Sequence, residues 1–262
     1  MTQIDTASER ELDRLIQEAG ERLLHYWPGT VVKHADKQLK IETKTDGSPV
    51  TCADIESNEI LIKGLRELFP GDGIFSEELY NDPALSTQTR VWIIDPLDGT
   101  KSFVEGHDDF SILLSLCVNQ SIEFSMMYFP ARKKFARALR GRGATLDGVK
   151  LEVSKSDAFR ERSIYLRHIP VPDEKCFYDA WMDAGLAFLS LCRGTLDGIV
   201  MRLIHHQEWD LAAPVLMIEE SGGKVTDEFG NPLQFNKGPI RYGYLVASNG
   251  ILHPQILKLI SQ

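Results

Sequence analysis

Apolar residues recur at intervals of three and four near the start of the chain and again after position 50. The first series is Leu12, Leu15, Ile16, Ala19 and Leu23, and the second is Ile60, Leu61, Leu65 and Leu68. This interval places apolar side chains on one face of a helix. It predicts amphipathic helices over about 8–27 and 51–69, separated by a polar loop with one short strand.

The pattern changes after residue 73, where short apolar runs replace the helical interval. Strands are predicted at 91–94, 111–118, 122–128 and 134–138, with a shorter one at Ile74-Phe75. The sequence Leu146-Asp147-Gly148-Val149 contains the Asp-Gly pair that is typical of a two-residue hairpin turn. It therefore predicts two further strands, one on each side of the turn.

The remaining residues alternate between strand-like and helix-like patterns. Strands at 163–166 and 198–203 alternate with helices at about 174–192 and 211–221, and a final helix begins near Pro254. An α+β half followed by an α/β half predicts layered sheets and helices. The 262 residues are enough for one large domain or two packed halves, and we place the boundary between 1–152 and 153–262.

Composition and charge narrow the possible functions. The chain is 43% hydrophobic and 26% charged, as in ordinary globular proteins, and its net charge is -9. No basic patch dominates, which argues against binding to a nucleic acid polymer or a membrane surface. No apolar run reaches the ~18–20 residues of a membrane span, and no signal peptide is visible. The four cysteines are scattered, which favours reduced thiols and a cytoplasmic location.

The segment VWIIDPLDGTKSF (91–103) places two carboxylates directly after a buried strand. Pro96 cannot continue a sheet ladder, so we expect the chain to turn there and to release Asp95 at the end of the strand. Asp98 follows three residues later, so both carboxylates can face one pocket and offer hard oxygen ligands to Mg²⁺. Bound cations would also let an acidic protein accept an anionic substrate. Taken alone, the segment favours a loop whose Asp side chains cap turns over a metal site.

The residues after Asp98 predict a tight bend and a short helix. Gly99 permits the bend, and Thr100–Phe103 opens the helix, with Ser102 and Glu105 at the spacing of a capping box. A helix amino end presents free N–H groups and the positive end of the helix dipole, which suit a phosphate.

Three other acidic positions have both a structural and a functional interpretation. Glu77 follows the short strand at Ile74-Phe75 and is followed by Glu78, a pair that is often just a solvated edge. Asp210 precedes a helix and could simply cap it. Asp54 has the position of the acid in a Thr51-x-x-Asp54 capping box.

Together these segments resemble the signature of the lithium-sensitive, magnesium-dependent phosphatases. That superfamily includes inositol monophosphatases, 3'(2'),5'-bisphosphate nucleotidases and, more distantly, fructose bisphosphatases. The resemblance consists of Asp54, Glu77-Glu78, DPLDGT (95–100), Trp209-Asp210 and Gly222-Gly223, in order along residues 44–235. It implies a layered α-β-α-β-α sandwich and a phosphoric monoester hydrolase.

The resemblance also implies a role for each matching position. Asp95 would bridge two metals, Glu77 and the Leu97 carbonyl would complete the first site, and Asp98 and Asp210 would belong to the second. Thr100, paired with Asp54, would polarise the attacking water, and Glu78 would not be a direct ligand. Substrate contacts are expected at Glu77, Leu97, Asp98, Gly99, Thr100, Asp210 and Arg202. The resemblance further implies two or three Mg²⁺ ions, inhibition by Li⁺, a small phosphorylated substrate and a possible homodimer.

The substrate is less firmly indicated. The run KTDGSPVTCAD (44–54) is most similar to CysQ-type bisphosphate nucleotidases, which predicts conversion of adenosine 3',5'-bisphosphate to AMP and phosphate. Leu203 stands where inositol monophosphatases usually carry a Glu, and its neighbour Arg202 suits a second phosphate. The family's Gly-Ser segment is represented only by Gly185-Leu186. The side chains of Lys44 and Lys101 could contact phosphates or could simply be surface charges. His205 and His206 could line the rim of the pocket or be solvated.

Three alternatives remain open. An inositol or broad sugar monophosphatase would use the same metal site. A haloacid-dehalogenase phosphatase would use a nucleophilic Asp, although its Asp-x-Asp-Gly-Thr motif is one residue shorter than the spacing here. A metal- or nucleotide-binding protein without catalysis is the alternative from another class.

Overall fold

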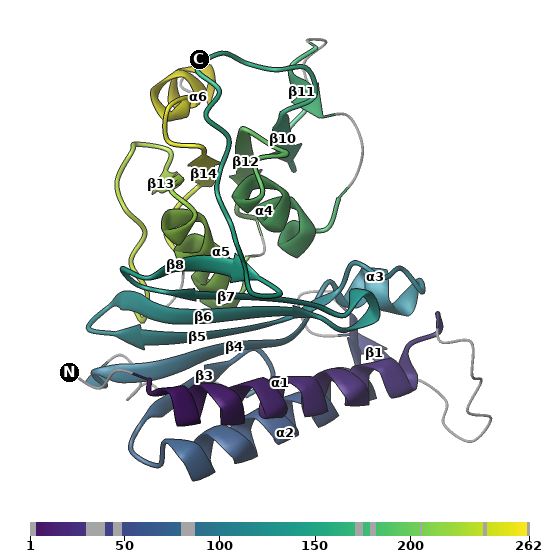
Figure 1. Cartoon of the computed structure of the whole chain (residues 1–262). Helices are drawn as coiled ribbons and strands as arrows, with labels where there is room; N and C mark the ends of the chain where they lie inside the picture. The colour runs from purple at the N-terminus through teal and green to yellow at the C-terminus, as the bar shows by residue number, and fades with distance from the viewer. Residues whose placement is uncertain are drawn as a thin grey trace.

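The chain folds into five stacked layers in the order helix, sheet, helix, sheet, helix (Figure 1). The computed structural model describes residues 4–29, 40–43, 49–79, 87–170, 175–178, 182–204, 206–237 and 240–260. Two long helices form the first layer, a seven-stranded sheet the second, and two helices lie between it and a five-stranded sheet. One helix covers the outer face of the second sheet. This is the predicted α-β-α-β-α sandwich.

The outer helices are α1 (Thr6–Tyr26) and α2 (Cys52–Leu68), close to the predicted ranges. Asp5 caps α1 by accepting a hydrogen bond from the backbone N–H of Ser8 at 2.7 Å. The apolar stripe of α1 is buried, as its spacing predicts. The loop before α2 contains a pair of short antiparallel strands, β1 (Ile41–Thr43) and β2 (Pro49–Thr51), where a single strand was expected.

The seven-stranded sheet contains every strand predicted between residues 73 and 152. Its members are β3 (Gly73–Ser76), β4 (Arg90–Asp98), β5 (Ser111–Val118), β6 (Ser121–Phe129), β7 (Lys134–Leu139), β8 (Gly143–Leu146) and β9 (Val149–Lys150), in that order across the sheet. Only β3 and β4 run parallel among the described pairs, so their carboxyl ends meet at one edge. The turn at Asp147-Gly148 has positive φ at both residues, as the hairpin prediction requires.

The second sheet has the order β11-β10-β12-β14-β13. Its strands are β10 (Ile164–Arg167), β11 (Phe177–Tyr178), β12 (Gly198–Arg202), β13 (Lys224–Asp227) and β14 (Tyr244–Ser248). Helices α4 (Ala184–Cys192) and α5 (Glu208–Glu220) lie between the sheets, and α6 (His253–Ile260) lies outside. The helix predicted over 174–192 is therefore wrong in its first half, where residues 177–178 pair with β10. Helix α5 begins three residues earlier than the predicted 211.

Both faces of the first sheet are buried. Val91 and Ile93 belong to the hydrophobic cluster shared with α4 and α5, whereas Trp92 and Ile94 pack beneath α1 and α2. A strand buried on both faces is a continuous apolar run, which explains the sequence pattern before Asp95. The cluster between the sheets contains residues from both sides of position 152. The division into 1–152 and 153–262 stays a prediction.

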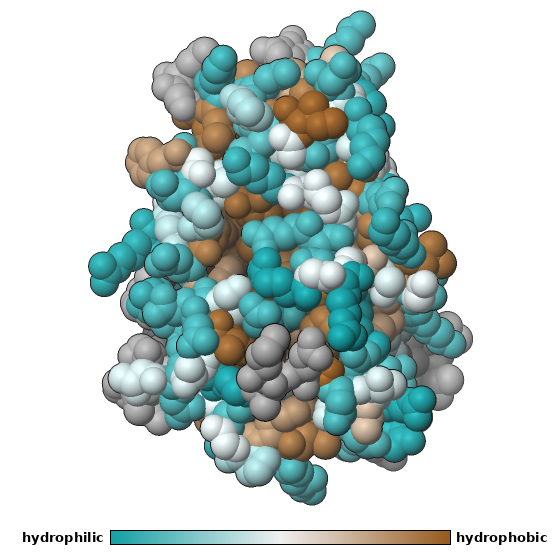
Figure 2. All heavy atoms as spheres, turned by 60° about the vertical axis from the view of Figure 1, so that its left-hand side comes forward, coloured by the Kyte–Doolittle hydropathy of each residue, from teal (hydrophilic) through white to brown (hydrophobic). Residues whose placement is uncertain are grey.

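The surface mixes polar and apolar residues. On the face in Figure 2, hydrophilic residues predominate and the hydrophobic ones form small separate groups. Among the described helices, none has the length and apolar character needed to cross a membrane. All four cysteines carry free thiols, and burial raises the pKa of Cys117 and Cys192 to about 12. These two thiols are therefore structural rather than reactive.

Candidate metal centre

A β-bulge brings the two aspartates of the central motif together. Asp95 pairs with Leu113 and Asp98 with Ser111, so three steps along β4 match two along β5. In a regular strand, residues three apart point to opposite faces, and one extra residue restores the same face. The expectation that Pro96 ends the strand is wrong, because β4 continues to Asp98 and the bulge accommodates the proline. The expectation of a shared pocket is met through this bulge.

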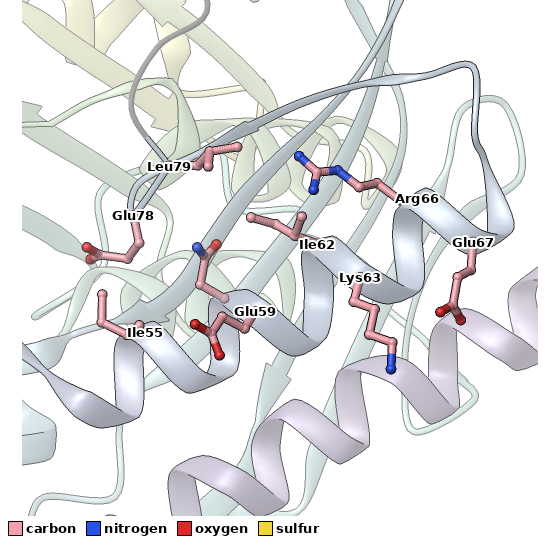
Figure 3. A pocket seen from close by; sticks show the side chains of 9 residues that line it. Ile55, Glu59, Ile62, Lys63, Arg66, Glu67, Glu78 and Leu79 are labelled. Atoms are coloured by element: carbon pink, nitrogen blue, oxygen red, sulfur yellow. The ribbon is translucent and has the colours of Figure 1, made fainter.

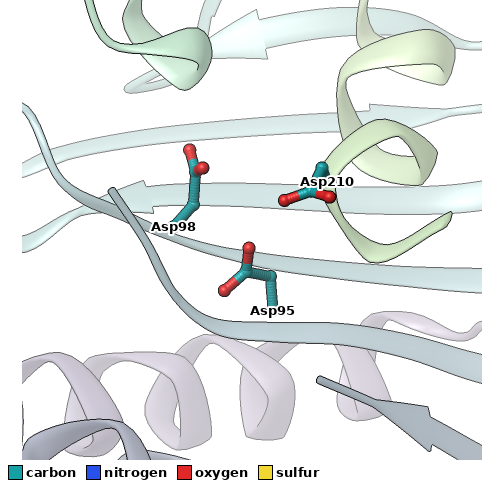
Figure 4. Close-up of side chains that lie close together, drawn as sticks. All are labelled: Asp95, Asp98 and Asp210. Carbon is teal, nitrogen blue, oxygen red and sulfur yellow. The ribbon is translucent and has the colours of Figure 1, made fainter. Parts of the chain in front are cut away.

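A third carboxylate comes from the second half of the chain. Asp210 lies in the first turn of α5 and accepts a hydrogen bond from the backbone N–H of Gln207 at 2.5 Å. One carboxylate oxygen from each of Asp95, Asp98 and Asp210 lies within 4.8 Å of the others. Figure 4 shows the three side chains turned toward a common space between β4 and the start of α5. This donor set of carboxylates alone fits a hard cation such as Mg²⁺.

Glu77 completes the acidic cluster from a neighbouring strand. Its backbone N–H donates to the carbonyl of Ile94 at 3.2 Å, which fixes it at the carboxyl end of β3 beside β4. Its carboxylate lies near Asp95, whose pKa it raises. Glu78 instead lines a pocket of about 550 Å³ along α2, together with Leu79 (Figure 3). The assignment of Glu77 and not Glu78 as a ligand stays a prediction, since the charges of both glutamates also act on Asp54.

The electrostatics of the cluster favour neutralisation. Burial raises the pKa of Asp95 well above its usual range, and the charges of Glu77 and Asp98 add to the increase. Burial also raises the pKa of Asp210, with Glu77 as the next cause. Several carboxylates so close together cannot all ionise without a compensating charge. A bound divalent cation would supply that charge and keep all of them ionised.

Thr100 and Asp54 lie against one side of the cluster. The Thr100 Oγ1 is 3.1 Å from Asp54 Oδ1 and 3.1 Å from the carbonyl oxygen of Leu97. The other oxygen of Asp54 accepts hydrogen bonds from the Thr51 backbone N–H and hydroxyl at 2.8 and 2.6 Å. Asp54 therefore completes the capping box with one oxygen and contacts Thr100 with the other. Burial raises the pKa of Asp54 to about 6.

The bend after Asp98 depends on Gly99. Its φ of 82° lies in the left-handed region that favours glycine, and it precedes the short helix α3 (Thr100–Val104). The predicted helix is present, but the predicted capping box is wrong. Ser102 lies inside α3 and Glu105 follows its end, so neither can cap its start.

Asp183 is a site residue that the sequence patterns did not indicate. It caps α4 and is 3% exposed, and a hydrogen bond links its carboxyl to that of Asp98. Asp98 also accepts a hydrogen bond from the Ser111 hydroxyl at 3.1 Å. A Cβ at Gly185 would lie 2.9 Å from Asp98 Oδ2, so a side chain there would displace the Asp98 carboxylate. Burial, and then the charge of Asp98, raise the pKa of Asp183 well above its usual range.

The structure does not bring Arg202 to the cluster. Along β12, Ile199 and Met201 face the cluster between the sheets, whereas Val200 faces α6. Arg202 shares the face of Val200 and is exposed. Leu203, by contrast, packs against the inner cluster. The cation whose charge acts on the aspartates is Arg167, at the end of β10.

The remaining rim candidates are only partly described. Lys44 and His205 lie outside the described residues. The ring of His206 lies 5.7 Å from the ring of His168, at the end of the second sheet that also carries Arg167. Lys101 is exposed in α3.

Comparison with known proteins fits the geometry. Residues 8–262 match the inositol monophosphatase family. The chain belongs to this family. It is 31% identical over 229 residues to a histidinol-phosphatase of Chlorobaculum parvum, covering 82% of this chain and 84% of that protein. It is 28% identical to an inositol-1-monophosphatase of Bacillus subtilis, covering 98% and 96%. An IMPase structure from Thermotoga maritima superimposes with a TM-score of 0.79 at 27% identity, covering 95% and 96%.

Membership of the inositol monophosphatase family confirms the predicted enzyme class. This family member is a phosphoric monoester hydrolase with the family's layered fold. Membership also excludes the haloacid-dehalogenase alternative. Magnesium dependence is a property of the family, and the acidic cluster is suited to it. Closeness to the CysQ-type nucleotidases within the family stays a prediction.

Proposed function

We propose that this enzyme hydrolyses a small phosphorylated metabolite with a water molecule activated at the acidic cluster. The observation that carries the proposal is the position of the Thr100–Asp54 pair beside the cluster of Asp95, Asp98 and Asp210. A phosphomonoesterase of this kind needs ligands for cations and a group that orients water. Both lie close together here, and they come from elements far apart in the sequence.

Five groups would hold the cations. Asp95 is central, because its carboxylate lies near Glu77, Asp98 and Asp210 at once. We assign Glu77 and the Leu97 carbonyl to one site and Asp98 and Asp210 to the other, with Asp95 shared by both. Bound Mg²⁺ would supply Lewis-acid activation of water and compensation of the phosphate charge.

Thr100 would orient the attacking water. A hydroxyl has one proton to donate and two lone pairs that accept. When Thr100 donates to Asp54 Oδ1, a lone pair stays available to accept a hydrogen bond from water. Asp54 must be ionised to accept that bond fully, and its other oxygen is held by Thr51. The chain thus fixes the direction of the hydroxyl before substrate binds.

Adenosine 3',5'-bisphosphate is our leading candidate substrate, with AMP and phosphate as products. The sequence run at 44–54 and the absence of a Glu at Leu203 support it. The positive charge of Arg167 near Asp98 also favours a leaving group that carries a second phosphate. Inositol 1-phosphate is the alternative, supported by the relative from Bacillus subtilis. Histidinol phosphate, the substrate class of another relative, carries an ammonium group that Arg167 would repel.

A substrate panel tests the proposal. Phosphate release from adenosine 3',5'-bisphosphate, inositol 1-phosphate and histidinol phosphate is measured with Mg²⁺, with EDTA, and with Mg²⁺ plus Li⁺. We expect hydrolysis only with Mg²⁺, the highest kcat/KM for the bisphosphate, and inhibition by Li⁺. A tenfold preference for the inositol ester would overturn the substrate proposal. Trapping of a phosphoryl group on Asp95 would overturn direct attack by water.

A matched pair of variants tests the ligand assignment. Asp95→Asn should lower kcat by about 10³-fold or more, because it removes the shared ligand. Glu78→Gln should leave kcat within about tenfold of the wild-type value, because Glu78 lines the α2 pocket. Equal losses in two folded variants would contradict the assignment.

A further inference from the structure

Arg167 is held at the edge of the acidic cluster by the backbone. Its Nη1 donates a hydrogen bond to the carbonyl of Met182 at 2.9 Å, and the Tyr165 hydroxyl donates to the same carbonyl at 2.7 Å. Met182 immediately precedes Asp183, whose carboxyl contacts Asp98. A short chain of contacts therefore connects the guanidinium to the metal-binding motif.

The Arg167 guanidinium has an N–H donor that is not hydrogen-bonded in the structure. The Nε of Arg167 is buried and has no hydrogen-bond partner in the structure, and across the described residues its guanidinium forms no ion pair within 4.0 Å. A buried, unpaired donor on a charged group is costly unless a ligand satisfies it. Among the arginines near an acidic residue, Arg160 shows the contrast, since it is fully engaged by Asp197. Arg167 is thus placed for a partner that the protein does not itself supply.

The position of Arg167 indicates which part of a substrate it would meet. Its charge acts on Asp98, Asp183 and Asp210, the part of the cluster that lies toward the second sheet. Thr100 and Asp54 belong to the first layers and lie on the side proposed for the attacking water. In-line displacement places the leaving group opposite the attacking water. Arg167 therefore lies on the leaving-group side.

A purely structural role is the competing interpretation. In it, Arg167 only balances the negative cluster and holds the Met182 carbonyl. Balance alone does not require an unpaired buried Nε, and it becomes less necessary when cations neutralise the carboxylates. With the cluster neutralised, the guanidinium beside it is an uncompensated positive charge.

We propose that Arg167 binds a second anionic group, a phosphate, on the leaving group of the substrate and so selects bisphosphorylated substrates. The proposal rests on the proposed function and replaces Arg202, the residue indicated by sequence, with Arg167. A planar guanidinium suits a phosphate because it can donate two parallel hydrogen bonds.

Two substrate pairs that differ by one phosphate isolate this contact. Adenosine 3',5'-bisphosphate is compared with adenosine 3'-phosphate, and fructose 1,6-bisphosphate with fructose 1-phosphate, for wild type, Arg167→Gln and Arg167→Lys. For Arg167→Gln we expect kcat/KM of the preferred bisphosphate to fall about 10- to 100-fold, mainly through KM. The corresponding monophosphate should change by less than about threefold, and Arg167→Lys should recover part of the loss. The pair that responds identifies a nucleoside or a sugar as the carrier.

Arg202→Gln is the matched control, because Arg202 is an exposed arginine at the end of the neighbouring strand on the other face. It should behave as wild type with all four substrates. An equal loss on both members of each pair, with a lower melting temperature, would show that Arg167 has only a structural role. Binding of AMP in the presence of Mg²⁺ is measured as well, and Arg167→Gln should weaken it about tenfold or more. If wild type hydrolyses nothing, the proposed function fails, while measurable AMP binding that is equal in wild type and Arg167→Gln would overturn this inference separately.

Discussion

Replacing Asp95 by Asn should stabilise the metal-free protein while removing its response to magnesium. The amide keeps an oxygen that can accept the hydrogen bond from the Leu97 N–H, now 3.0 Å from Asp95 Oδ1. It removes one negative charge from a group whose carboxylate oxygens lie within 4.8 Å of those of Asp98 and Asp210. Two unit charges at 4.8 Å repel each other by about 3.5 kcal/mol at an effective dielectric constant near 20.

The observed gain should be smaller than this repulsion, because the wild-type protein relieves part of it by protonation. The pKa of Asp95 is raised in the fold, so the folded state binds protons more tightly than the unfolded state. Its stability therefore falls as pH rises above about 4 toward the raised pKa. At pH 8 in EDTA we expect the free energy of unfolding of the variant to exceed that of wild type by about 1–3 kcal/mol. For a chain of this size, each kcal/mol raises the melting temperature by roughly 2–4 °C. The gain should shrink at pH 5.

Thermal unfolding followed by circular dichroism, in EDTA and in 10-fold steps of MgCl₂, measures both effects. Wild type should rise in melting temperature with Mg²⁺, because a ligand that binds only the folded state stabilises it. The melting temperature of Asp95→Asn should be higher than that of wild type in EDTA and should rise little with added Mg²⁺. Asp197→Asn is the control of opposite sign, because Asp197 is paired with Arg160 and its neutralisation should destabilise the protein without affecting the Mg²⁺ response. A metal-free Asp95→Asn protein that is less stable than wild type and retains the full Mg²⁺ shift would refute the reasoning.

Three further predictions follow from contacts in and around the site. Thr100→Val should lower kcat by about 10²- to 10⁴-fold with an unchanged melting temperature, whereas Thr100→Ser should retain most activity; a fully active Val variant would remove Thr100 from the mechanism. Gly185→Ala should weaken Mg²⁺ binding in a calorimetric titration, because its Cβ would lie 2.9 Å from Asp98 Oδ2, whereas Gly71→Ala meets nothing within 4 Å and should bind as wild type. Burial lowers the pKa of His253 to about 4, so the folded state binds fewer protons than the unfolded state between pH about 6.5 and 4. The free energy of unfolding should therefore fall as the pH is lowered through that window, by at most about 3 kcal/mol, and should fall less in His253→Gln than in wild type. Urea unfolding at pH 7.5 and 4.5 measures this difference.

Local sequence patterns predicted the outer helices and the strands of the first sheet because these depend on short-range rules, whereas the proposed metal ligands came from the resemblance to a family. Period and length identified α1, α2 and the strands of the first sheet. Glu77 and Asp95 could be paired in advance because each follows an apolar strand, and the ends of neighbouring parallel strands meet. The Thr51–Asp54 spacing predicted a capping box, which is present.

What the sequence did not reveal depends on pairing between distant segments. The bulge at Pro96 arises from the register between β4 and β5, which the spacing within the motif does not fix. Residues 177–178 were predicted as helix because an apolar pattern surrounds them, yet β10 recruits them into the sheet. Asp183 and Arg167 stand in segments without a recognisable motif, and only the packing of α4 and β10 brings them to Asp98. The face of Arg202 could have been predicted from the alternation along β12, because its neighbours Met201 and Val200 are both apolar and only one face meets the site.

The three-residue spacing of Asp95 and Asp98 places both carboxylates on one face only because β4 contains a bulge between them. Carboxylates two residues apart share a face on any regular strand, whereas a pair three apart can do so only where the strand carries an extra residue. If one residue were deleted or inserted between Asp95 and Asp98, the two carboxylates would share a face only if β4 lost its bulge and ran as a regular strand. The spacing of these two aspartates and the bulge therefore depend on each other.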